Sequence, residues 1–326
     1  MKVCPGLTTT LSDLTAGGSW SSSAANASVD VSTGVVTGVS AGTVYISYTS
    51  ALGCSRFVAF TVNPAPAAIS GPSTVCVGSV IALTDATSGG VSWTSSNTTV
   101  ATVNSTTGGV TGVGAGVANI TYSLGTGCFA TKSVSVNPLP SAIGGTLKVC
   151  VGSATALTNT LSGGSWSSSN ITVAPVDITT GVVTGNSAGM ATITYTSAAG
   201  CYKTAVVTVN PLPTAIAGYL TACVGTTTTL TAGAGGTWSS SATGIATVGV
   251  STGVVTGVTA GTATISYTLT TGCHSTTTVT INPAPTAITG TGTLCAGATT
   301  TLSNAQPGGS WTISNTAVAT IGVSTG

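Results

Sequence analysis

Apolar residues alternate with hydroxyl-bearing residues along most of the chain. The stretch from residue 253 to 268, GVVTGVTAGTATISYT, shows the pattern most clearly, because Val, Ala and Ile positions alternate there with Thr and Ser. A period of two residues predicts β-strands. We therefore expect two strands joined by a turn in this stretch, with Gly257 and Gly261 at turns or bends. Since no segment shows a helical period, the sequence predicts an all-β protein.

The same pattern recurs along the chain, so the sequence is a tandem array. Tryptophan occurs at positions 20, 93, 166, 238 and 311, and an Asn-Pro-x-Pro element recurs at 63–66, 137–140, 210–213 and 282–285. Two prolines in four residues end a strand and favour an extended, semi-rigid connection. We place boundaries at these elements and call the resulting stretches units 1 to 5. They are residues 1–66, in which the first strand is missing, 67–140, 141–213, 214–285 and 286–326, which is truncated.

Each complete unit has room for about seven short strands. In unit 4 we expect strands at 214–216, 227–231, 237–240, 245–248 and 276–281, with two more inside 253–268. Seven short strands with turn signals every 8 to 12 residues are typical of an immunoglobulin-like β-sandwich. The predicted architecture is therefore a row of such sandwiches, arranged as an extended rod.

A family resemblance rests on one run of residues that every unit carries wholly or in part. The run is Trp-Ser-Ser-x-x-x-x-Val-Ala-x-Val, followed by Gly-Val-Val-Thr-Gly-x-x-Ala-Gly-Thr-Ala-x-Ile-x-Tyr. It resembles the bacterial immunoglobulin-like group 2 domain. The added cysteine pair is similar to repeats in large secreted surface or adhesin proteins of the Bacteroidetes type. The resemblance implies an extracellular spacer or adhesin stalk, but not a ligand, because one fold serves many partners.

Charge is scarce in the 326 residues. Five basic and four acidic side chains, with one His, give a formal net charge of +1. Nucleic-acid binding needs clustered Lys and Arg, so it is not expected, and neither is a polybasic membrane patch. The sequence has no run of 18 apolar residues, so we do not expect this segment to insert into a membrane. The low charge indicates either a surface covered by neighbours in an assembly or a hydroxyl-rich soluble surface.

The cysteines follow the repeat and predict a disulfide framework. Each complete unit has an early and a late cysteine, 50 to 52 positions apart, which is typical of an oxidising compartment. We expect pairing within the repeat, because the two cysteines occur together in every complete unit. The expected pairs are Cys4 with Cys54, Cys76 with Cys128, Cys150 with Cys201, and Cys223 with Cys273.

Pairing between neighbouring units is the alternative, for example Cys54 with Cys76 or Cys4 with Cys128. In a sandwich the early cysteine lies near one end and the late cysteine near the tip of the last hairpin, whereas bonded Cα atoms lie within about 7 Å. Cys295 is expected to be unpaired in this window, with its partner beyond Gly326. Lys2-Val3-Cys4 matches Lys148-Val149-Cys150 inside a later unit. We therefore expect a window of a longer protein, with signal and sorting segments outside it.

The aromatic residues recur at fixed places in the units. A row of tryptophans suggests carbohydrate stacking, but an immunoglobulin-like sandwich buries its largest side chain at this place, so we expect the tryptophans in the cores. Tyr48, Tyr122, Tyr195 and Tyr267 are expected to pack on the same cores or at their edges. The core tryptophans are Trp20, Trp93, Trp166, Trp238 and Trp311.

No set of residues predicts catalysis, and we expect no catalytic, metal-binding or cofactor-binding site. The four carboxylates are Asp13, Asp30, Asp85 and Asp177, and equivalent positions of other units hold Asn or Gly, which is typical of turns. Calcium needs several converging oxygens, and zinc needs four close ligands. The chain is therefore not expected to be an enzyme.

These observations predict a structural protein, a disulfide-stabilised stalk or self-assembling filament at the cell surface or outside the cell. Its expected partners are copies of itself or neighbouring repeats. The alternative is an adhesin or binding module that recognises a glycan or a cell surface through its loops.

Overall fold

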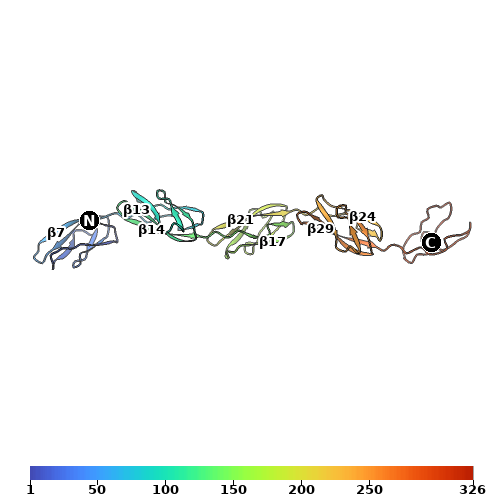
Figure 1. The fold of residues 1–326 in the computed structure, drawn as a ribbon, viewed down its shortest axis with the longest axis horizontal. Helices are drawn as coiled ribbons and strands as arrows, with labels where there is room; N and C mark the ends of the chain where they lie inside the picture. The colour runs from blue at the N-terminus through green and yellow to red at the C-terminus, as the bar shows by residue number, and fades with distance from the viewer. Residues whose placement is uncertain (326) are drawn as a thin grey trace.

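Units 1 to 4 each fold into two β-sheets, and the units follow one another in a row (Figure 1). The structure is a computed structural model that describes residues 1–325. It contains strands, turns and bends but no helix within those residues, which confirms the all-β prediction. Accordingly, nothing in residues 1–325 is a helix long and apolar enough to cross a bilayer.

Unit 2 shows the arrangement. One sheet has the strand order β10-β13-β14-β8 and the other has the order β11-β12-β9. The long hairpin β13–β14 forms the centre of the first sheet, and β8 runs parallel to β14 at its edge. The strands are β8 (Thr74–Cys76), β9 (Val80–Ala82), β10 (Gly90–Ser95), β11 (Ala101–Val103), β12 (Gly109–Gly112), β13 (Gly116–Leu124) and β14 (Phe129–Asn137).

Unit 1 repeats this topology, with sheets β1-β7-β6-β3 and β2-β5-β4. Unit 3 has the same first sheet, β16-β21-β20-β18, but its second sheet is β15-β17-β19, in which β15 is added at one edge and a single bridge, Val176 to Val183, stands at the place of β11. The strands of unit 1 are β1 (Lys2–Val3), β2 (Thr8–Thr10), β3 (Ser19–Ser22), β4 (Ala27–Val29), β5 (Val35–Gly38), β6 (Gly42–Thr49) and β7 (Ser55–Val62). Those of unit 3 are β15 (Gly144–Gly145), β16 (Lys148–Cys150), β17 (Ala154–Thr158), β18 (Ser165–Ser168), β19 (Val182–Thr184), β20 (Gly189–Thr196) and β21 (Tyr202–Asn210).

Unit 4 confirms six of the seven predicted strands. The strand predicted at 214–216 is wrong, because those residues directly follow the Pro-rich connection and are not paired, and the first strand is Ala217–Gly218 instead. The strand predicted at 227–231 is present with those bounds, but the short strand Thr221–Cys223, which runs parallel to the last strand, was not predicted. A three-residue edge strand is too short to show a period of two. The strands of unit 4 are β22 (Ala217–Gly218), β23 (Thr221–Cys223), β24 (Thr227–Thr231), β25 (Gly236–Ser240), β26 (Ala246–Val248), β27 (Val254–Gly257), β28 (Gly261–Leu269) and β29 (His274–Asn282).

The apolar face of each sheet pair forms a small core of its own. In unit 2, Trp93 on β10 packs against Tyr122 on β13, with ring centroids 4.7 Å apart, and Val110 from the facing sheet is fully buried. Equivalent cores form in units 1, 3 and 4. Four tryptophans, Trp20, Trp93, Trp166 and Trp238, are buried as predicted.

Trp311 differs from the other four and is only half-buried, so the prediction that it is a core residue is wrong. The physical reason is that residues 286–325 form a single isolated bridge, Thr289 to Ser303, and no named strand. No tyrosine-bearing strand therefore covers the Trp311 ring within the part of the chain that the structure describes.

Candidate functional site

The late cysteine of each unit lies at the tip of its long hairpin. In unit 2, Cys128 directly precedes β14, and the backbone N–H of Leu124 donates a 2.9 Å hydrogen bond to its carbonyl oxygen, which closes the tight turn. Gly127 in this turn has φ +87°, a conformation that suits glycine. This tip points toward unit 1 (Figure 1).

The early cysteine lies at the opposite end of the unit. Cys76 ends β8 and pairs in parallel register with Asn137, the last residue of β14. Gly112 at the end of β12 lets this strand approach, because a Cβ there would lie 2.6 Å from the Cys76 carbonyl oxygen. Gly257, expected at a turn, has the same role beside Cys223. These glycines therefore help to position the early cysteine at the end of the unit that faces the next one.

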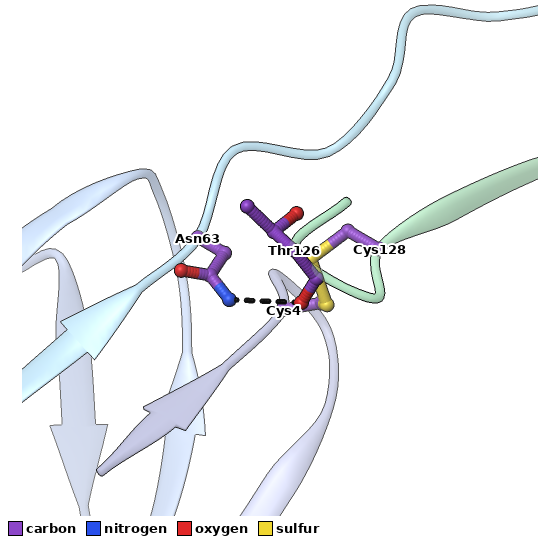
Figure 2. Close-up of a disulfide and its surroundings, with 4 residues drawn as sticks. All are labelled: Cys4, Asn63, Thr126 and Cys128. Carbon is purple, nitrogen blue, oxygen red and sulfur yellow. Dashed lines mark hydrogen bonds between the residues drawn. A yellow bond between two sulfur atoms is a disulfide. The ribbon is translucent and has the colours of Figure 1, made fainter. Parts of the chain in front are cut away.

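Three disulfides cross the joints between units. Each joins the early cysteine of one unit to the late cysteine of the next, with Cα atoms 5.6 to 5.7 Å apart. Figure 2 shows the first of them, where the hairpin tip of unit 2 meets the end of unit 1. The pairs are Cys4–Cys128, Cys76–Cys201 and Cys150–Cys273.

The expected pairing within each repeat is therefore wrong, and the alternative that joins Cys4 to Cys128 is the one observed. The reason is the length of the last strand. In unit 2 the nine residues of β14 separate Cys128 from the end where Cys76 lies, which is about 30 Å at ~3.4 Å per residue. A disulfide cannot bridge that distance, since its Cα atoms lie within about 7 Å. The same distance excludes all four expected disulfides, which are Cys4–Cys54, Cys76–Cys128, Cys150–Cys201 and Cys223–Cys273.

The sequence contained a signal for this pairing. The distance from a late cysteine to the next early cysteine is 22 positions in every instance, whereas the distance within a unit varies from 50 to 52. A constant spacing indicates a segment that runs straight, because loops tolerate insertions. The four instances are Cys54 to Cys76, Cys128 to Cys150, Cys201 to Cys223, and Cys273 to Cys295.

The joints are packed around the disulfides. The side-chain amide of Asn63, the first residue of the Asn-Pro-x-Pro element, donates a 3.2 Å hydrogen bond to the Thr126 carbonyl oxygen in the hairpin tip of unit 2 (Figure 2). Asn63 is buried, as are Cys128, Cys201 and Cys273. Asn63 therefore helps to dock unit 2 onto the end of unit 1.

Three cysteines have no disulfide partner within residues 1–325. Cys54 is a late cysteine and Cys223 is an early one, and Cys295, as expected, is also unpaired. All three are exposed. The equivalent early or late cysteine of another unit forms a disulfide across a joint, so each of these thiols is one half of such a disulfide.

The tryptophan row does not form a ligand-binding surface, because burial leaves Trp93 only 6% exposed. A hollow of about 300 Å³ beside Trp93 and Tyr122 contains one carboxylate, Asp85. The Tyr122 hydroxyl donates to the Thr87 carbonyl oxygen, as the other core tyrosines do to equivalent carbonyls, so these hydroxyls stabilise loops.

Each carboxylate accepts hydrogen bonds from residues of its own turn. The Asp30 carboxylate accepts hydrogen bonds from the backbone and hydroxyl of Thr33 and from Ser32. These bonds lower the pKa of Asp30 from 3.8 to about 2. Equivalent bonds, led by the backbone N–H of Thr180, lower the pKa of Asp177. Within residues 1–325 no three His, Cys, Asp or Glu side chains gather as metal ligands would.

Comparison with solved structures gives matches of low overall similarity. The surface layer protein SbsC (domains 1–6) is 18% identical with a TM-score of 0.22, and the match covers 84% of this chain and 51% of that one. The bacterial integrin-binding protein invasin is 15% identical with a TM-score of 0.31, covering 84% of this chain and 75% of that one. A fragment of intimin, solved with its receptor domain, is 18% identical with a TM-score of 0.33, covering 49% and 69%. This chain spans about half the length of the surface layer structure.

No curated protein matches the chain. Two stretches, residues 56–136 and 129–209, match the family described as bacterial Ig-like domain (group 2). Each stretch runs from the last strand of one unit to the last strand of the next, and the sandwich topology of the structure agrees with it. Residues 56–209 therefore contain two tandem matches to the bacterial immunoglobulin-like (group 2) domain family.

Proposed function

We propose that the chain is a structural rod of a cell surface or of an extracellular filament, stiffened by its disulfides. The observation that carries the proposal is the covalent bond across each of three successive joints. A linker alone allows neighbouring domains to move, whereas a second covalent connection at the same joint restricts bending. Disulfides persist in oxidising environments, which supports an extracellular location.

Negative-stain imaging of the purified chain tests this proposal. Straight single rods in the absence of reductant, and bent or beaded particles after reduction, are the expected result. Flexible beads under both conditions would contradict a structural role for the disulfides.

We also propose that each unit is a domain, with boundaries at the Asn-Pro-x-Pro elements and spans 1–66, 67–140, 141–213, 214–285 and 286–326. Separate cores in units 1 to 4 support this. Limited proteolysis of the reduced chain is expected to cut first near residues 64–68, 138–143 and 211–216. Early cuts inside a long hairpin would refute these boundaries.

Self-association into a filament is the finer form of the proposal. The net charge of +1 on 326 residues leaves little repulsion between rods, and a repeated surface can offer the same contact many times. Sedimentation velocity over a range of concentrations is expected to show assemblies larger than one chain. A monomer at every concentration would limit the function to a stalk.

None of these roles needs catalysis, and we propose that the chain is not an enzyme.

A binding role is the second candidate, and one feature of unit 1 favours it. Tyr45 and Phe57 form an exposed edge-to-face pair on neighbouring strands β6 and β7, with ring centroids 5.4 Å apart. An exposed aromatic pair suits contact with a glycan or a protein surface. A glycan array probed with the chain, and with a Tyr45→Thr, Phe57→Thr variant, is expected to separate specific hits from background.

A further inference from the structure

The spacing of the cysteines, combined with their pairing, defines two covalent paths along the rod. One path runs through Cys4–Cys128, then along residues 128–150, then through Cys150–Cys273. The other runs along residues 54–76, through Cys76–Cys201, then along residues 201–223. The two paths alternate from joint to joint, so each disulfide connects to the one two joints further along.

The connecting segments have limited room to lengthen. In residues 128–150, β14 accounts for nine residues and reaches the joint between units 2 and 3. The 13 residues from Pro138 to Cys150 then cross unit 3, whose length is set by the nine-residue strand β21, about 30 Å. Thirteen residues reach at most about 45 Å. The segment can therefore lengthen by no more than about 15 Å.

Most of each sandwich lies outside these paths. Residues 77–127 of unit 2 contain five of its seven strands, β9 to β13, yet they form a branch between Cys76 and Cys128. Unfolding such a branch does not lengthen the shortest covalent connection between the ends of the rod.

We infer that the staggered disulfides carry tensile load along the rod, so that pulling force bypasses the sandwich cores. The inference deepens the proposed structural function and rests on it for its biological purpose. A rod of this kind does not extend by unfolding its domains, as a simple tandem array does. Its length under force is limited by the connecting segments between disulfides, such as residues 128–150, until a disulfide is reduced.

Single-molecule stretching between handles at the two ends measures this property. In a background with Cys54, Cys223 and Cys295 replaced by Ser, the oxidised path consists of residues 1–4, 128–150 and 273–326. Its contour length at rupture is about 280 Å, against about 1,100 Å for the reduced chain, at ~3.4 Å per residue. Rupture lengths near the reduced value without reductant would overturn the inference.

Two single variants separate this pairing from every other. Cys76→Ser breaks a disulfide but leaves the first path intact, so the oxidised length stays at about 280 Å. Cys150→Ser interrupts that path and raises the length to about 620 Å, because the chain must follow the longer branches. Lengthening by Cys76→Ser, or no change with Cys150→Ser, would refute the load path.

Loss of the load path and loss of the structural function are distinguishable. If imaging shows straight rods that bend on reduction but stretching gives a long contour length, the structural role is supported and only the inference about tensile load is contradicted. Wild-type measurements with and without reductant keep the test decisive should Cys150→Ser fail to fold.

Discussion

Single glycines allow a turn to lie directly over the core tryptophan. Gly108 has φ +73°, and a Cβ at this position would lie 3.0 Å from the Trp93 ring and 2.5 Å from the Leu83 carbonyl oxygen. Gly34, Gly181 and Gly253 hold the same position in the other units. The tryptophan is therefore covered by backbone that only glycine can supply.

Gly108→Ala should destabilise unit 2 by about 2–3 kcal/mol, because it adds both a strained backbone and a core contact. Hydrogen exchange of peptides from 101–124 measures the local loss. Gly89→Ala is the matched control, since Gly89 also has a positive φ of +87° but open space around its Cβ. Equal effects of the two substitutions would show that the contact with Trp93 is unimportant.

The turn at Asp30 should respond to acid. Its folded pKa of about 2 lies below the ordinary 3.8, so the ionised carboxylate stabilises the turn fully above about pH 4. This stabilisation is lost as the pH falls through about 2. Carboxyl-carbon NMR titration should give an apparent pKa near 2, and Thr33→Ala, which removes the hydroxyl donor, should raise it.

The equivalent turn of unit 2 is an internal control. Asn104 accepts hydrogen bonds from Thr106 and Thr107 as Asp30 does from its neighbours, but its amide does not titrate. Amide shifts of this turn should stay constant over the same pH range. An Asp30 titration at the ordinary value would contradict the hydrogen-bonded turn.

At the scale of strands, the short edge strand that holds the early cysteine determines where the disulfide to the next unit forms. Gly112→Ala should displace β8 by crowding the Cys76 carbonyl, and so lower the yield of Cys76–Cys201 on oxidative refolding. Peptide mapping without reductant measures the yield. Gly109→Ala on the same strand β12 should leave it unchanged, because the nearest atom to its Cβ is 3.5 Å away.

Most strands and four of the five predicted core tryptophans were predictable from the sequence, whereas the expected cysteine pairing was wrong. Alternation identified the long hairpins such as β28–β29, and the tryptophan period identified the cores. The parallel strand β23 has three residues, too few for a period, so the alternation did not reveal the strand that holds Cys223 against the last strand. The occurrence of two cysteines in each unit favoured pairing within the unit, and only the constant spacing of 22 between units pointed the other way.

For the whole molecule, reduction should change shape before it changes folding. Each of units 1 to 4 has a buried core, and no disulfide joins the two cysteines of one unit. Small-angle X-ray scattering should therefore show a smaller radius of gyration after reduction, while the far-ultraviolet circular dichroism stays the same. Loss of β-structure together with loss of length would show that the disulfides also maintain the sandwiches.

The forward offset of the pairing has a consequence for how such an array changes by recombination. Because an early cysteine bonds with whichever unit follows, removing residues 141–213 deletes Cys150 and Cys201 together and brings Cys76 next to Cys273. The shortened array would then contain a Cys76–Cys273 bond, with no thiol stranded in its interior. Duplication of a unit is equally neutral. Gene copies that differ by whole repeats would encode rods of different length with the same chemistry at every joint.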